Sequence, residues 1–157
     1  MEIITIIVAI YGAILSTVNI VLFTKAHRTS LLVELSKGYL VGKGHRDKNL
    51  YLFWNVYNKG AKNVNLSMVG FRIKSIKDDF KIPYQTPPGI QLPFEIKPGQ
   101  SYCCFTTTKQ IAEALKEIGC SGETKIIGYF SDAIKNRYYS KPFIFNIEKN
   151  LKNETKQ

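Results

Sequence analysis

The feature that most constrains this chain is an apolar segment near its N-terminus. No formal charge falls between Ile3 and Phe23. A helix of roughly 20 such residues spans the ~30 Å hydrocarbon core of a bilayer. A signal peptide would have a basic start and a small-x-small cleavage site, whereas Glu2 precedes this segment and Thr24-Lys25-Ala26-His27-Arg28 follows it. A buried core helix would show polar positions on one face. We therefore predict a retained transmembrane helix, with residues 1–28 forming the anchor and its basic exit.

Charge predicts how this helix is oriented. Lys25 and Arg28 follow its C-terminal end, while only the amine and Glu2 lie on the other side. The positive-inside rule then places the N-terminus outside and the rest of the chain in the cytoplasm. The chain has three cysteines, which are too few for a disulfide-dense secreted scaffold and suit a reducing compartment. We expect a single-pass protein of the inner (cytoplasmic) membrane.

One face of the predicted helix holds small and polar residues at heptad spacing. Its members are Thr5, Ala9, Gly12, Ser16, Asn19 and Phe23. Small residues let helices approach closely, and an amide in hydrocarbon needs a hydrogen-bond partner. We call these six positions the seam and predict that it makes a homo-oligomer; the alternatives are that small residues are common in membrane helices and that Asn19 reaches the headgroups. A water-lined pore along the seam is a further hypothesis, and it requires an oligomer.

Residues 29–148 alternate apolar and polar positions between frequent turn signals, which predicts strands. We expect a bulge near Gly70 and a core position for Trp54. The expected strands are Leu31–Leu35 and Tyr39–Val41 as a broken first strand, Leu50–Tyr57, Val64–Ile73, Phe94–Ile96, Ser101–Thr107, Lys125–Phe130 and Tyr138–Ile147.

One helix interrupts these strands. Thr107 or Thr108 is a suitable N-cap, Ile111, Leu115 and Ile118 share one face, and Gly119 fits the position after the helix. About seven strands with one short helix predict an all-β immunoglobulin-like sandwich at residues 29–148. Residues 149–157 are polar and charged, which predicts a disordered tail.

No catalytic pattern is recognisable in the sequence. Gly42-Lys43-Gly44 is too short for a dinucleotide fingerprint, and neither His27 nor His45 has a nucleophile or carboxylate at a suggestive spacing. Adjacent Cys103 and Cys104 point to opposite faces of one strand. We therefore expect no enzymatic activity, no metal and no cofactor.

The loop at residues 42–48 is the most concentrated polar feature of the predicted domain. Its cations and exposed glycine amides suit phosphate groups, and the whole chain has 22 Lys and Arg against 12 Asp and Glu. We predict a nucleotide or oligonucleotide ligand; the alternative is a solvated loop in a basic protein. The candidate ligand-binding residues are Lys43, His45, Arg46, Lys48, Lys109 and Lys116.

A second set of cations is expected to face the lipid headgroups. The strand order returns the turn at residues 59–63 and the hairpin at residues 132–136 to the membrane side. Each such cation near an anionic surface contributes about 1 kcal/mol, although solvated loop lysines are the alternative. The set comprises Lys25, Arg28, Lys59, Lys62, Lys135 and Arg137.

Two blocks carry a resemblance to known proteins. They are Leu92-Pro93-Phe94-Glu95-Ile96-Lys97-Pro98-Gly99-Gln100-Ser101, and Ile126-Ile127-Gly128-Tyr129-Phe130-Ser131-Asp132 followed by Tyr138-Tyr139-Ser140-Lys141-Pro142. The layout resembles small bacterial single-pass membrane proteins with a cytosolic immunoglobulin-like sandwich. That class includes membrane effectors of phage-defence systems, and the plan is similar to Hailong-type effectors, which are oligomeric channels controlled by a DNA oligomer.

Two functions follow as hypotheses. The first is a non-enzymatic membrane effector in bacterial anti-phage defence, a pore or channel component gated by a nucleotide or oligonucleotide bound to the basic domain. The alternative is a passive membrane-tethered module that recruits a protein or nucleic-acid partner.

Overall fold

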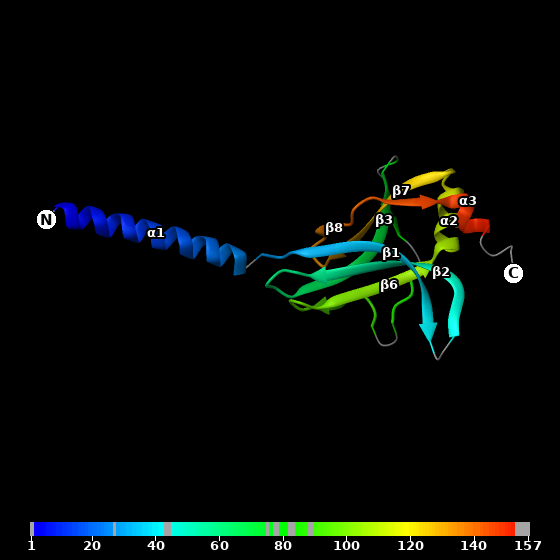
Figure 1. The fold of residues 1–157 in the computed structure, drawn as a ribbon, viewed down its shortest axis with the longest axis horizontal. Helices are drawn as coiled ribbons and strands as arrows, with labels where there is room; N and C mark the ends of the chain where they lie inside the picture. Colours follow the sequence, from blue (N-terminus) through cyan, green and yellow to red (C-terminus); the bar gives the residue numbers. More distant parts are fainter. Residues whose placement is uncertain are drawn as a thin grey trace.

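The computed structural model describes residues 2–26, 28–42, 45–74, 76, 79–81, 84–87 and 90–152, and the side chains of residues 26, 42, 45 and 46 lie outside this description. Helix α1 (Glu2–Ala26) extends from one end of a β-rich domain (Figure 1). Among the described residues, α1 is the one helix long and apolar enough to cross a membrane, and no part of its span is buried against the rest of the protein. We call the end of the domain nearest this helix the α1 end.

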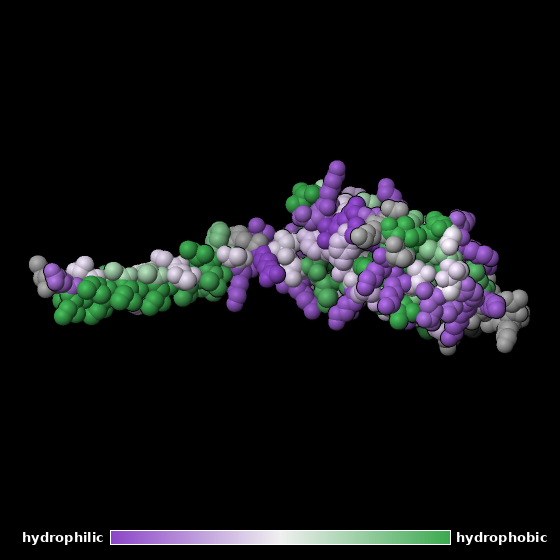
Figure 2. Space-filling view, turned by 90° about the horizontal axis from the view of Figure 1, so that it is seen from above, coloured by the Kyte–Doolittle hydropathy of each residue, from purple (hydrophilic) through white to green (hydrophobic). Residues whose placement is uncertain are grey.

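The surface of α1 is almost entirely apolar on one side. Its large apolar side chains are between 47% (Val18) and 74% (Ile3) exposed. Figure 2 shows a strip of pale, less hydrophobic residues along one side of the helix and strongly hydrophobic residues along the other. Exposing a continuous apolar surface of this size to water is unfavourable. Burial in lipid or against other helices removes this cost.

The β domain consists of two antiparallel sheets. Sheet A has the order β1-β2-β6, and sheet B has the order β4-β3-β7-β8, with β5 also paired to β3 and β9 also paired to β7. Sheet A comprises β1 (Leu31–Gly42), β2 (His45–Asn58) and β6 (Ser101–Thr107). Sheet B comprises β3 (Val64–Ile73), β4 (Asp79–Lys81), β5 (Phe94–Ile96), β7 (Glu123–Asp132), β8 (Arg137–Tyr139) and β9 (Phe143–Asn146).

The core lies between the two sheets, and Trp54 is its largest anchor. Trp54 is 1% exposed, and its Nε1 donates a hydrogen bond of 3.2 Å to the carbonyl of Gly70 in sheet B. Alternate β2 residues Leu52 and Val56 share its buried face, and Phe71 and Phe130 belong to the same core from sheet B. The predicted core position of Trp54 is therefore confirmed.

The predicted helix after residue 107 is also confirmed. Helix α2 (Thr108–Glu117) has Thr107 as its N-cap, whose Oγ1 accepts a hydrogen bond from the Gln110 amide. Gly119 follows the helix with a φ of 84°, a conformation that favours glycine. Helix α2 packs at the end of the domain opposite α1, together with α3 (Ile147–Lys152) (Figure 1).

Five details of the predicted strands and tail are wrong. The first strand is continuous, because Lys37 and Gly38 stay in register with Leu52 and Tyr51. The bulge lies at Ser67 rather than near Gly70, and the Ser67 hydroxyl donates to the Asp132 carbonyl at 2.8 Å.

The other three concern the end of the chain and the connection between β3 and β5. The expected last strand is divided into β8 and β9 by residues 140–142, and residues 149–152 of the expected disordered tail belong to α3. Strand β4 was not among the expected strands. Residues 153–157 of the tail lie outside the described residues.

The segment that links α1 to the domain is fixed by backbone hydrogen bonds. The carbonyl of Ser30 accepts from the amides of Lys59 (2.8 Å) and Gly60 (3.0 Å), and the carbonyl of Arg28 accepts from Ala61 (3.2 Å). A Cβ at Gly60 would lie 2.6 Å from both the Arg28 oxygen and the Ser30 nitrogen, so only glycine permits this approach. The turn at residues 59–63 is thereby held against the exit of α1.

Candidate anionic-ligand and membrane surfaces

The exit of α1 and the adjoining turn form a basic hollow. Lys25, Arg28 and Lys59 line it together with residues 30, 60 and 61, and its volume is about 380 Å³. Three cations converge here because the backbone contacts of residues 28–30 bring the turn beside the helix. The positive charge of this hollow is suited to binding anionic lipid headgroups.

The hairpin at residues 132–136 lies at the same end of the domain. The amide of Ala133 donates to the carbonyl of Asn65 at the start of β3. Asp132 organises the hairpin by accepting from the amides of Ile134 (3.1 Å) and Asn136 (2.8 Å). Ile134 is 79% exposed and Lys135 follows it, so the tip presents an apolar side chain beside a cation.

Most of the predicted headgroup cations therefore lie at the α1 end. Lys62 is exposed in the turn that also holds Lys59, and Lys135 is exposed in the neighbouring hairpin. Arg137 is the exception, because its guanidinium contacts the Asp79 carboxylate on the outer face of sheet B. The lipid contact predicted for Arg137 stays a prediction.

The predicted ligand loop is only partly described. Lys43 lies outside the described residues, and so do the side chains of His45 and Arg46, whose backbone belongs to β2. Lys48 is exposed on β2, and Figure 1 shows that the end of β1 and the start of β2 lie away from α2.

The other two predicted ligand residues, Lys109 and Lys116, belong to helix α2. Lys109 is half-buried in the first turn of α2. The Gly122 amide lowers the pKa of the Glu148 carboxyl in α3, and Lys152 and Lys116 add smaller effects. Lys116 thus lies near α3.

A different group of cations is brought together by sheet B. Val69, Phe71 and Ile73 of β3 are buried in the core, so the alternate residues Arg72 and Lys74 point to the outer face. Register places further cations on that face, with Lys81 opposite Gly70 and Arg137 opposite Ser131. We call Arg72, Lys74, Lys81, Lys125 and Arg137 the basic face.

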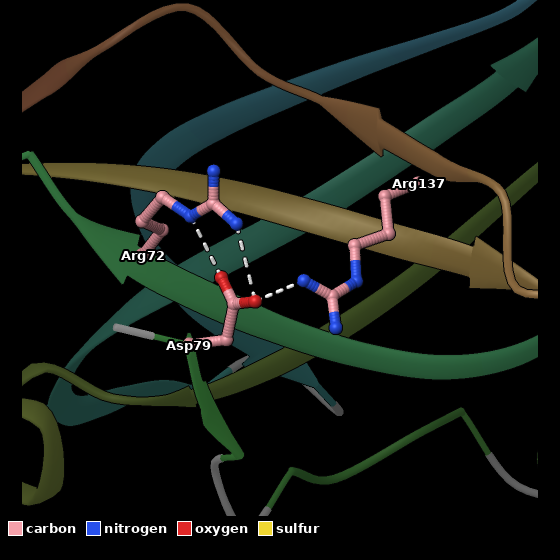
Figure 3. Close-up of polar contacts among 3 residues, drawn as sticks. All are labelled: Arg72, Asp79 and Arg137. Carbon is pink, nitrogen blue, oxygen red and sulfur yellow. Dashed lines mark hydrogen bonds and ion pairs between the residues drawn. The ribbon is translucent and has the colours of Figure 1, made fainter. Parts of the chain in front are cut away.

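Two arginines of the basic face share one carboxylate (Figure 3). Arg72 donates through Nε to Asp79 Oδ1 at 2.8 Å and through Nη2 to Oδ2 at 3.2 Å. Arg137 donates through Nη1 to the same Oδ2. The hydrogen bonds from Arg72 hold the pKa of Asp79 below its usual range, so this carboxyl is ionised at neutral pH.

Both guanidiniums also lie over tyrosine rings. The Arg72 guanidinium is 5.0 Å from the centre of the Tyr139 ring, and that of Arg137 is 5.3 Å from the centre of the Tyr129 ring. Tyr139 is 42% exposed, whereas Tyr129 is 1% exposed beneath this layer. The rings are neighbours because Tyr129 and Tyr139 are directly paired across β7 and β8. Cation and aromatic contacts of this kind suit a ligand that has both phosphate and base.

The basic face continues into a cleft at the end opposite α1. Lys74 and Lys125 line this cleft of about 690 Å³, and Glu123 is the one acidic side chain among its described lining residues. The amide of Lys74 donates to the Lys125 carbonyl at 3.0 Å, which holds the two residues side by side. Counting Asp79 and Glu123 against the five cations leaves the combined surface positive.

Sequence reasoning missed this surface because its members are far apart in the chain. The one local pattern that points to it is the alternation of Arg72 and Lys74 with buried apolar residues, which indicates that both cations lie on the outer face of a strand. The pairing of β3 with β4 and β7, which adds Asp79, Lys81 and Lys125, has no local signature. The rings of Tyr51 and Phe53 on β2 do not offer a second base-stacking surface, because both pack against Phe105.

The adjacent thiols of Cys103 and Cys104 do not have the environment of catalytic nucleophiles. Burial raises the pKa of Cys103 and, more strongly, that of Cys104. Both are therefore protonated near neutral pH, and the nucleophilic form is the thiolate. Within the described ranges, no group of His, Cys, Asp and Glu is arranged to hold a metal ion.

Comparison with known proteins gives no family. No family model matches the chain, and no curated protein matches it. Among solved structures, the chain is similar to a structural genomics target designated SoR45, with 12% identity, a TM-score of 0.38, and coverage of 74% of this chain and 86% of that one. It is likewise similar to a putative ApaA protein from Bordetella pertussis, with 11% identity, a TM-score of 0.37, and coverage of 75% and 94%.

Proposed function

We propose that this protein is a non-enzymatic membrane effector whose α1 helices associate in the bilayer and whose cytoplasmic β domain binds a nucleotide or oligonucleotide. Ligand binding shifts the associated helices between closed and open arrangements, which requires different affinities for the two states. The observation that carries this proposal is the exposure of α1. The helix is unburied along its whole span and has one row of small and polar residues.

The polar groups of α1 support association through the seam. Thr17 and Thr24, which lie off the seam, donate through Oγ1 to the carbonyls of Ala13 (2.9 Å) and Ile20 (2.7 Å) in the same helix. Within the described helix, no hydrogen bond of the Asn19 amide is found, and an amide side chain is costly to leave unpaired in hydrocarbon. A second α1 helix packed on the seam supplies the partner.

The charge of the α1 end supports a cytoplasmic domain. Lys25, Arg28 and Lys59 gather where the helix leaves the domain, and Lys135 lies beside the exposed Ile134. Cations at this end follow the positive-inside rule and suit the anionic inner leaflet. We infer that this end of the domain rests on the lipid surface.

The finer fold and the biological setting belong to the same proposal. Two antiparallel sheets around a core that includes Trp54 support an immunoglobulin-like sandwich. The proposed role in bacterial anti-phage defence rests on the resemblance in plan to single-pass effectors, with a membrane helix followed by a basic β domain.

Leakage from vesicles tests the proposed function. The full-length protein is reconstituted into vesicles that contain an anionic lipid and a fluorescent dye, and short single-stranded oligonucleotides are added outside. We expect dye release that depends on both protein and oligonucleotide. A protein that inserts and binds oligonucleotide but releases no dye under any ligand condition would contradict the channel.

A passive tether is the second candidate, and the basic face is the observation that favours it. This surface lies on sheet B. Its charge suits an acidic partner, and α1 contributes no residue to it. The two functions differ in how they depend on the seam. A tether keeps its partner when the seam is altered, whereas the effector loses its membrane activity.

A further inference from the structure

The Arg72–Asp79–Arg137 cluster has more positive than negative charge. Asp79 accepts only a minority of the N–H donors that two guanidiniums carry. Lys81 lies on the same face two register pairs from Asp79, since Lys81 is opposite Gly70 and Asp79 is opposite Arg72. All three side chains of the cluster are partly exposed, so a solute anion can reach them.

The position of Asp79 is also suited to a phosphate. Its two oxygens accept the parallel Nε and Nη2 donors of Arg72, and one of them also accepts from Arg137 (Figure 3). Arginine binds carboxylate and phosphate oxygens with the same fork of donors. The protein's own carboxylate therefore marks where two oxygens of a phosphodiester would be held.

Aromatic rings lie directly beside this position. Tyr139 is exposed next to the Arg72 guanidinium, and Tyr129 lies under that of Arg137. The ring centres are 6.0 Å apart. A base that stacks on Tyr139 thus has its phosphate within reach of the arginine pair, which is the combination used to bind single strands.

We propose that Arg72 and Arg137 form the phosphate site for a single-stranded oligonucleotide, that Tyr139 stacks one of its bases, and that Asp79 is an internal anion that the phosphate displaces. The site deepens the proposed function and rests on it, since it gives the gating ligand a place to bind. Lys74 and Lys125 extend the positive track toward the cleft, which suits a ligand of several nucleotides.

A purely structural role for the cluster predicts the opposite response to one substitution. If the cluster only ties β4 to β3 and β8, Asp79→Asn leaves oligonucleotide binding unchanged or weakens it. If Asp79 competes with the ligand, Asp79→Asn tightens binding because the arginines are released. The sign of this change separates the two roles.

The experiment uses the full-length chain in detergent and a fluorescent oligothymidylate whose anisotropy is followed at fixed salt. We expect Asp79→Asn to tighten binding about fivefold, and Arg137→Gln to weaken it about tenfold. Tyr139→Leu should weaken it about tenfold through lost stacking. Thermal melts check that each variant is folded, and Arg137→Lys, which keeps the charge but loses the fork, should weaken binding with an unchanged melt.

Lys48→Gln tests the loop first predicted to bind the ligand. Lys97→Gln is the matched control, because Lys97 is an exposed cation outside both that loop and the basic face. Its binding should stay within about twofold of the wild type. A larger loss of oligonucleotide affinity for Lys48→Gln than for Arg137→Gln would overturn the site. Weaker or unchanged binding by folded Asp79→Asn would also overturn it. Either result leaves the proposed function standing.

Competitors separate the sources of phosphate. We expect thymidine monophosphate to displace the probe more effectively than inorganic phosphate, because only the nucleotide has a base to stack. Equal competition would overturn the proposal. If the wild type binds no oligonucleotide at all, both this site and the gating step of the proposed function fail, while association of α1 is tested separately.

Discussion

Replacing Gly12 or Asn19 by leucine should weaken association of the full-length protein in detergent. At Gly12, a leucine side chain prevents the close backbone approach that a small-residue seam permits, and we expect association to weaken at least about tenfold. At Asn19, leucine removes an interhelical hydrogen bond of about 1 kcal/mol, a loss of about fivefold per contact. The oligomer mass, measured by light scattering with correction for detergent, reports both effects.

The chain offers a matched control for each variant. Ala13→Leu adds the same bulk beside Gly12 but off the seam. Thr17→Leu removes a hydroxyl that bonds within its own helix. Both controls should keep the oligomer mass of the wild type. Equal losses for seam and control variants would mean that the helices do not pack through this face, and a monomeric wild type would exclude association altogether.

Trp54→Ala should bring the β domain close to unfolding while leaving the protein in the membrane. The ring is 1% exposed and is the largest fully buried side chain of the domain, so its removal leaves a cavity between the sheets. Such truncations cost about 3–5 kcal/mol, against a typical total of about 5–15 kcal/mol. The midpoint of urea unfolding, followed by circular dichroism of the detergent-solubilised chain, measures the loss.

Two further variants separate packing from polar effects at this position. Trp54→Phe fills most of the cavity but leaves the Gly70 carbonyl without its donor, which should cost about 1 kcal/mol more than the volume change alone. Phe53→Ala, on the opposite and half-buried side of β2, should cost much less than Trp54→Ala. A Trp54→Ala domain as stable as the wild type would contradict the assignment of this residue as the core anchor.

The elements predicted correctly from sequence are those whose signals are local. The apolar run before Lys25 predicts a helix of membrane-spanning length, and the Thr107 cap with Gly119 predicts both limits of α2. Alternation around Trp54 predicts the central strand and its buried face. Each of these features depends on a single stretch of chain, so no knowledge of pairing partners is needed.

The elements that were missed depend on pairing between distant segments. The Ser36-Lys37-Gly38 turn signal is overridden because β2 pairs with β1 along its length. Strand β4 is three residues long and exists because β3 offers it an edge. The candidate ligand site has the same origin: Arg72, Asp79 and Arg137 come from three strands, and only the sheet register brings them together.

Protease protection in cells tests the central claim most directly, namely that α1 crosses the membrane and holds the basic domain on the cytoplasmic side. In one experiment, isolated membranes are washed with alkaline carbonate. In a second experiment, intact cells and permeabilised cells are treated with protease. The account predicts that the full-length protein stays with the membrane and that its domain is digested only after permeabilisation. Release by carbonate, or digestion of the domain in intact cells, would contradict it.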